Sequence, residues 1–217
     1  MITIKSFCFN SFEENTYVLS DETKECIIID PGCHMKEEEQ ELTGYISEKN
    51  LKPVRLVNTH CHIDHILGNG FIASKYGLVL EAHQMEIPVL KSSDYVSKMY
   101  QIHLNPSPEI GKFLKEGDTI KFGNSELMIF FTPGHSPGSI TFYSPDGKFI
   151  ISGDVLFERS IGRTDLPGGD YDTLIDSIIT KLLPLGDDVL VYCGHGNSTL
   201  LGEEKRLNPF LREHLQN

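Results

Sequence analysis

Residues 59–65 read THCHIDH, and three histidines, one cysteine and one aspartate stand within six positions of this stretch. Side chains of all three types bind metal ions in proteins. A chance HxHxDH pattern is rare, so the stretch indicates a metal site. The preceding run PVRLVNT (53–59) favours a strand, which predicts that these side chains follow a strand end.

Alternation along an extended chain sorts the five candidate ligands. His60 and His62 are two positions apart and are expected on one face, with Cys61 on the other. His65 joins Asp64 only if the chain turns after the first pair and begins a helix. Two ligand pairs in one loop therefore indicate two metals rather than one. Cys61 is predicted to be a small, buried, apolar side chain.

Three further candidates each follow an apolar strand and stand beside a glycine. His135 lies in TPGHSPGS, Asp154 in ISGD and His195 in YCGHGNS. Taken singly, such a histidine is more often a hydrogen-bonded or surface residue, and such an aspartate is often a turn former. Their shared setting is the one expected of ligands on loops at a rigid sheet edge. The remaining histidines, without comparable partners, are His34, His83, His103 and His214.

The composition limits the class of protein. The chain has 217 residues, 39% hydrophobic and 23% charged, which is ordinary for a soluble globular protein. Its net charge of −12 argues against nucleic acid or an anionic membrane as partner. Five cysteines without a CxxC pair indicate neither a disulfide framework nor a cysteine-rich zinc site, and they favour a reducing cytoplasm. We see no signal peptide and no membrane span.

The element pattern predicts an α/β chain of the α+β type. Strands are expected at 2–9, 15–20, 25–30, 53–59, 77–82, 188–192 and in a β-rich stretch over 118–154. Helices are expected at 36–49, 66–77, 171–183 and 203–215. Residues 92–117 are interpreted as a long loop or small insertion that helps form a substrate cleft. Two strand blocks that each end in helices indicate two sheets packed face to face with helices outside.

The motifs together resemble the metallo-β-lactamase superfamily over nearly the whole chain. They are HxHxDH at 60–65, PGHSPGS around His135, SGD ending at Asp154 and GHG at 194–196. The resemblance implies one domain over 1–217, an αββα four-layer sandwich with metals at one edge of its sheets. It also implies a first metal held by His60, His62 and His135. It gives the second metal to Asp64, His65 and His195, makes Asp154 the bridge, and places Asp30, in IIIDPG, behind the site.

Within that superfamily the chain is most similar to the short bacterial form of the glyoxalase II (hydroxyacylglutathione hydrolase) group. The similarity lies in SIGRTDLPGGDYDTL (160–174), GHG (194–196) and EKRLNPFL (204–211). The C-terminal helical domain with which longer members hold glutathione is not expected here. Classical zinc β-lactamases of the commonest type carry cysteine where Asp154 stands, which argues against antibiotic hydrolysis.

The expected function is therefore metal-dependent hydrolysis of a small-molecule thioester, such as an S-2-hydroxyacyl thiol. Two divalent ions, Zn²⁺ first and Fe²⁺ or Mn²⁺ as alternatives, activate a bridging hydroxide and hold the developing oxyanion. Asp154 is expected to hold the metal spacing and Asp64 to orient the hydroxide.

Two residues are candidates for substrate binding. Arg163 matches a basic residue near the glutathione site of the longer relatives and is expected to bind an anionic group. The alternative is that it pairs with Asp165 or Asp170 and fixes its own loop. Tyr171 is a weaker candidate, because an aromatic residue at a helix start usually serves packing.

Other functions remain open from the sequence. A mononuclear iron persulfide dioxygenase resembles this family and uses only the first-site ligands with Asp154, although GHG favours the hydrolase. A lactonase or other ester hydrolase would share the metals and differ in the pocket. A non-catalytic metal module is disfavoured, because closed structural sites favour cysteine. The sequence makes no prediction of the oligomeric state.

Overall fold

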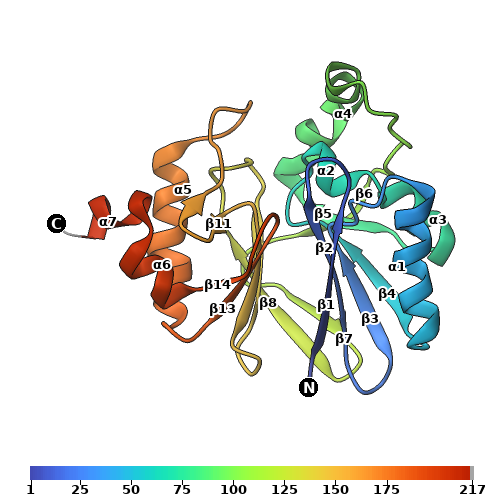
Figure 1. Ribbon diagram of the computed structural model, residues 1–217, viewed down its shortest axis with the longest axis horizontal. Coiled ribbons are helices and arrows are strands. Elements are labelled where there is room, and N and C mark those ends of the chain that lie inside the picture. The colour runs from blue at the N-terminus through green and yellow to red at the C-terminus, as the bar shows by residue number, and fades with distance from the viewer. Residues whose placement is uncertain (216–217) are drawn as a thin grey trace.

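Two six-stranded sheets pack face to face between layers of helices in the computed structural model, which describes residues 1–215 (Figure 1). The order of the first sheet is β1-β2-β3-β4-β5-β6. Its strands are β1 (Thr3–Phe9), β2 (Glu14–Ser20), β3 (Glu25–Ile29), β4 (Lys52–Val57), β5 (Leu80–His83) and β6 (Ile110–Leu114). The first three strands pair antiparallel, and β3 to β6 pair parallel.

The second sheet has the order β14-β13-β10-β9-β8-β7. Its strands are β7 (Thr119–Phe122), β8 (Ser125–Phe131), β9 (Ile140–Ser144), β10 (Phe149–Gly153), β13 (Leu190–Cys193) and β14 (Thr199–Leu200). Neighbours pair antiparallel except β10 with β13, which are parallel. A small hairpin joins β11 (Leu156–Phe157) to β12 (Ser160–Ile161).

Helices cover the outer face of each sheet (Figure 1). On the first sheet's side the helical elements are α1 (Lys36–Glu48), α2 (Ile63–Ile66), α3 (Asn69–Tyr76), the 3-10 turn η1 (Gln84–Glu86) and α4 (Ile87–Tyr100). On the second sheet's side they are α5 (Tyr171–Ser177), the π-turn η2 (Ile178–Leu182), η3 (Leu183–Leu185), α6 (Leu201–Leu207) and α7 (Pro209–Leu215). Among residues 1–215 no helix combines the length and apolarity that a membrane span needs.

The apolar run of β3 shows why four layers form. Ile27 and Ile29 face the second sheet and join the central core, whereas Ile28 faces outward and packs under α1 with Leu42. Because both faces of the strand are buried, its sequence is continuously apolar rather than alternating. A third cluster, which includes Ile150 and Leu174, lies under α5. The predicted αββα sandwich is confirmed.

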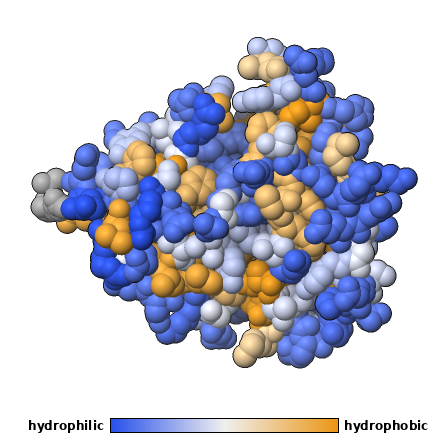
Figure 2. Space-filling view, in the orientation of Figure 1, coloured by the Kyte–Doolittle hydropathy of each residue, from blue (hydrophilic) through white to orange (hydrophobic). Residues whose placement is uncertain are grey.

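Two predictions about elements differ from the structure. Residues 92–117 are not mainly a loop, because α4 runs to Tyr100 and β6 covers Ile110–Leu114. Ser97 is the buried residue of α4, and hydrophobic side chains lie exposed over this helix, so no buried apolar stripe marks it in the sequence (Figure 2). The expected C-terminal helix is divided at Asn208, since the residue before a proline avoids the helical conformation.

Candidate metal centre

All the candidate ligands lie at one edge of the sandwich. They follow the carboxyl ends of β4, β8, β10 and β13. In the first sheet β4 runs parallel to β3, and in the second sheet β8, β10 and β13 run in one direction. Strands that run in one direction end at the same edge, so loops distant in sequence meet there. The edge therefore gathers the site from five separate segments, counting Asp30 after β3.

The first ligand triad consists of His60, His62 and His135, whose ligand atoms lie within 4.8 Å of one another. His135 Nε2 is 2.8 Å from His62 Nδ1 and 3.2 Å from His60 Nε2. Three converging imidazole nitrogens are a common ligand set for Zn²⁺ and similar ions.

The second ligand triad consists of Asp64, His65 and His195, again within 4.8 Å. Asp64 Oδ2 is 3.1 Å from His195 Nε2 and 3.6 Å from His65 Nε2. The expected turn between the two ligand pairs is α2, which begins at Ile63 with His62 as its N-cap. One loop and one short helix thus send ligands to both triads.

Asp154 stands between the two triads. Its Oδ1 is 3.4 Å from His65 Nε2, and its Oδ2 is 3.5 Å from His135 Nε2 and 3.4 Å from His195 Nε2. One carboxylate oxygen therefore faces both triads at once, which is the position required of a bridging ligand.

The donor set fits divalent cations. His65 Nε2 and Asp154 Oδ1 are buried polar atoms without a hydrogen-bond partner, and both point into the cluster. A buried polar group without a partner is costly, and a cation coordinated there would satisfy both atoms. Five histidines and one carboxylate in the two triads, with the Asp154 carboxylate between them, suit ions of the Zn²⁺, Fe²⁺ or Mn²⁺ type.

Cys61 does not join either triad. Its side chain is buried and packs with Ile66 and Ala82. Burial also raises the pKa of its thiol well above the usual value, so the thiolate that would bind a metal is disfavoured.

Hydrogen bonds from Nδ1 orient four of the five imidazoles. His135 donates to the carbonyl of Arg163 and His195 to the carbonyl of Phe12. A carbonyl can only accept, so Nε2 is left free to bind a metal.

Asp30 lies behind the cluster and holds the other two imidazoles. It accepts a hydrogen bond from His65 Nδ1 at 3.1 Å, and from the Thr59 hydroxyl at 2.5 Å. The same hydroxyl oxygen lies 3.1 Å from His60 Nδ1 and accepts a hydrogen bond from it. Asp30 thus supports one ligand of each triad. Thr59 directly precedes the HxHxDH motif, and nothing in the sequence predicts its role.

The two triads differ in charge when no cation is bound. In the first triad burial lowers the pKa of His62 to about 3, and burial lowers the pKa values of His60 and His135 as well. In the second triad burial opposes charge on His195, but hydrogen bonds to Asp154 and Asp64 outweigh it and raise its pKa to about 10.

His65 behaves in the same way as His195. Burial opposes its charge, and the carboxylates of Asp154 and Asp64 outweigh burial and raise its pKa. At neutral pH the first triad is therefore neutral, whereas the second holds imidazolium ions paired with carboxylates.

Glycines allow the strand ends to approach Asp154. A Cβ atom on Gly194 would lie 2.0 Å from Asp154 Oδ1, and one on Gly153 would lie 2.3 Å from Thr59 Oγ1. Gly153 also has a φ of +52°. Close packing against Asp154 thus explains Gly194, close packing against Thr59 explains Gly153, and Gly196 has a positive φ of +71° with open space around it.

The side chains of the two substrate-binding candidates, Arg163 and Tyr171, contact residues outside the two triads. Arg163 forms a two-pronged pair with Asp165, with both distances 2.7 Å, and both side chains are exposed. Asp170 instead caps α5 through Thr173. Tyr171 contacts His214 of α7, with the phenol oxygen 3.5 Å from Nε2. Arg163 therefore touches the centre through its backbone carbonyl, and the contact of Tyr171 is with α7.

The tail motif at 204–211 also gains a structural explanation. Glu204 is fully buried and accepts hydrogen bonds from Arg159, Thr199 and Asn208. These contacts tie the C-terminal helices to the β11–β12 hairpin, which leads into the Arg163 loop.

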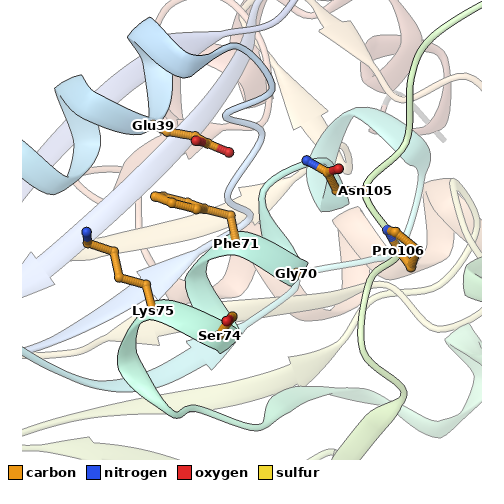
Figure 3. A pocket seen from close by; sticks show the side chains of 7 residues that line it. All are labelled: Glu39, Gly70, Phe71, Ser74, Lys75, Asn105 and Pro106. Carbon is orange, nitrogen blue, oxygen red and sulfur yellow. The ribbon is translucent and has the colours of Figure 1, made fainter.

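A separate surface hollow of about 490 Å³ lies on the first sheet's side (Figure 3). Glu39 of α1 and Phe71 and Lys75 of α3 line it together with Asn105 and Pro106. None of its lining residues belongs to either triad, so this hollow is not where the metal chemistry takes place.

The fold, the edge position and the two triads define a metal-dependent enzyme of the metallo-β-lactamase type. The model of the metallo-β-lactamase superfamily matches residues 11–195, and the chain belongs to this superfamily. It is 38% identical over 207 residues to the hydroxyacylglutathione hydrolase GloC of Haemophilus influenzae, covering 93% of this chain and 94% of that protein. It is 34% identical over 201 residues to the human mitochondrial persulfide dioxygenase ETHE1, covering 90% of this chain and 70% of that protein.

Solved structures have the same fold. The BLEG-1 B3 metallo-β-lactamase superposes with a TM-score of 0.88 at 33% identity, covering 96% of this chain and 99% of that one. The protein TTHA1623 in a di-iron-bound form superposes with a TM-score of 0.86 at 32% identity, covering 95% and 100%.

Proposed function

We propose that the chain is a two-metal hydrolase of thioesters, with S-2-hydroxyacyl thiols as the substrate class. The observation that carries the proposal is the pair of triads that share Asp154 at one sheet edge. The similarity to a hydroxyacylglutathione hydrolase over nearly the whole length of both chains supports this substrate class.

The chemistry follows from what each residue does. The two triads would hold two divalent cations, which would supply a hydroxide nucleophile at neutral pH and polarise the acyl carbonyl. Asp154 fixes the spacing of the triads, and Asp64 offers a carboxylate oxygen that can accept a proton from the nucleophile and orient it. The chain therefore needs no serine or cysteine nucleophile.

Arg163 is the proposed contact for an anionic group of the substrate. Its partner Asp165 is exposed, and exposed ion pairs contribute little to stability, so a substrate carboxylate can compete for the guanidinium. The Arg163 carbonyl accepts from His135 Nδ1, which keeps this loop beside the first triad.

The second candidate function is a mononuclear iron persulfide dioxygenase, which the similarity to the human dioxygenase favours. The complete second triad supports the hydrolase instead, since Gly194 lets β13 bring His195 close to Asp154. The similarity to a B3 metallo-β-lactamase makes a β-lactam the third substrate to test.

Metal analysis beside a substrate panel tests the proposal. The purified protein is expected to hold about two metal ions per chain, most readily Zn²⁺, and to release thiol from S-2-hydroxyacyl thiols. One iron per chain with oxygen consumed on glutathione persulfide would establish the dioxygenase. Hydrolysis of a chromogenic cephalosporin with inert thioesters would establish a β-lactamase.

The proposed location is the cytoplasm, with a small molecule as partner. All five cysteines are free, and four of them, Cys26, Cys33, Cys61 and Cys193, are buried. Thiols in this state suit a reducing compartment.

A further inference from the structure

Glu86 carries a fully buried carboxylate outside the candidate ligand set. It is the last residue of η1 and is 0% exposed. Burying a carboxylate is costly unless hydrogen bonds or opposite charges compensate. Within residues 1–215 no lysine, arginine or histidine forms an ion pair with it; burial raises the pKa of its carboxyl, and hydrogen bonds oppose that rise.

Three donors from two distant loops converge on this carboxylate. Oε2 accepts from the backbone N–H of Cys61 at 2.6 Å. Oε1 accepts from the Ser136 hydroxyl at 2.6 Å and from the backbone N–H of Gly138 at 2.7 Å. One side chain thus joins the loop after β4 to the loop after β8.

These two loops carry the whole first triad. Cys61 stands between His60 and His62, and Ser136 directly follows His135. The hydrogen bonds therefore fix the backbone beside all three imidazoles. No donor to this carboxylate lies beside His195, so the second triad depends on it far less.

The contacts select for a carboxylate in this place. All three partners are donors, so a glutamine amide would turn an N–H₂ group toward at least one of them. A Cβ atom on Gly138 would lie 2.7 Å from Glu86 Cγ, so the glycine is needed for the approach. The side chain makes no capping hydrogen bond to α4, so helix capping does not explain it.

We infer that Glu86 is a positioning residue of the first triad, which holds together the two loops that carry its three imidazoles and so sets their spacing for a divalent cation. The inference rests on the two-metal centre of the proposed function but not on its substrate. Replacing a buried residue that holds metal ligands in place typically weakens metal binding by roughly 10–100-fold.

Zn²⁺ titration against a chromophoric chelator tests the inference with each triad in turn disabled. In a His195→Ala background, which leaves the first triad intact, Glu86→Gln is expected to weaken Zn²⁺ binding by roughly 10–100-fold. In a His62→Ala background, which leaves the second triad, the same change is expected to alter Zn²⁺ affinity little. Equal weakening in both backgrounds would overturn the inference.

Glu204→Gln is the matched control, because Glu204 is equally buried and accepts several hydrogen bonds outside the first triad's loops. It is expected to lower the melting temperature and leave Zn²⁺ affinity unchanged. A Glu86→Gln protein that behaves in the same way would show that Glu86 serves general stability only.

If Glu86→Gln fails to fold, Ser136→Ala removes one donor and keeps the carboxylate. It should weaken Zn²⁺ binding in the His195→Ala background and not in the His62→Ala background, and unchanged affinity in both would overturn the inference. Because no thioester enters these titrations, failure of the proposed substrate class would leave their result intact.

Discussion

The two ligand triads begin in the same seven-residue stretch and yet differ in chemistry. The first is three imidazoles whose pKa values burial lowers, and the second is a carboxylate with two imidazoles whose pKa values neighbouring carboxylates raise. A cation entering the first triad finds free lone pairs, whereas a cation entering the second must displace protons from existing ion pairs. The two metals should therefore differ in affinity and in pH dependence.

The largest effect is expected from removing the group that the triads share. Asp154→Asn keeps the shape but removes the charge that faces His65, His135 and His195. Both metals should bind more weakly, and kcat should fall by about a thousandfold or more, the scale of losing a central electrostatic group. Metal analysis and thiol release measure the two effects. A variant that keeps both metals and most of its activity would contradict the bridging role.

Removing one ligand from each triad separates them. His62→Ala should lose the first metal and His195→Ala the second, and under the two-metal mechanism each should lower kcat by at least about a hundredfold. His103→Ala is the control, because His103 is exposed and belongs to neither triad. Full activity of His195→Ala with one metal bound would favour the mononuclear alternative.

The residues that gather in the candidate metal centre could be selected from the sequence because their signals are local. HxHxDH fixes four side chains within six residues, and a glycine beside a strand end marks each of His135, Asp154 and His195. The apolar run at Ile27–Ile29 likewise predicts a strand, and the structure buries both of its faces. The close contacts that require glycine, of Gly194 with Asp154 and of Gly153 with Thr59, become apparent only once the strands are placed.

What the sequence could not predict are roles that depend on distant partners. Glu86 is one glutamate among many until its donors, 25 and 50 or more residues away, fold around it. Glu14 is similar: it is fully buried in β2, 3.8 Å from His65, with no signal in its surroundings. Helix α4 could not be predicted because its hydrophobic side chains Tyr95 and Met99 face solvent, so they form no buried apolar stripe.

The charge difference between the triads predicts how metal binding depends on pH. Metal-free protein at pH 7.5 should take up the first Zn²⁺ without releasing a proton, because the pKa of His62 is about 3 and those of His60 and His135 are lowered. The second Zn²⁺ should release protons from His65 and His195, and its affinity should rise with pH up to about 10.

Calorimetry in buffers of different ionisation enthalpy measures that proton release.

The raised pKa of His195 also makes the stability of the metal-free protein depend on pH. The ion pairs of His195 stabilise the metal-free protein fully below pH about 6.5, the ordinary histidine pKa, and this stabilisation is lost as the pH rises through about 10. The melting temperature of the metal-free protein should fall over that interval. Equal proton release by both Zn²⁺ ions would show that the triads do not differ in charge.

The smallest effect is expected at Cys61, the one member of THCHIDH that can bind a metal and joins neither triad. Cys61→Ala removes a buried side chain packed with Ile66 and Ala82, and should cost about 1 kcal/mol of stability. The hydrogen bond to Glu86 comes from the backbone N–H and survives the change. Metal content should therefore stay the same, while His62→Ala, one residue away, loses a metal. A lost metal equivalent in Cys61→Ala would place the thiol in the coordination sphere and contradict the division of the stretch into two pairs.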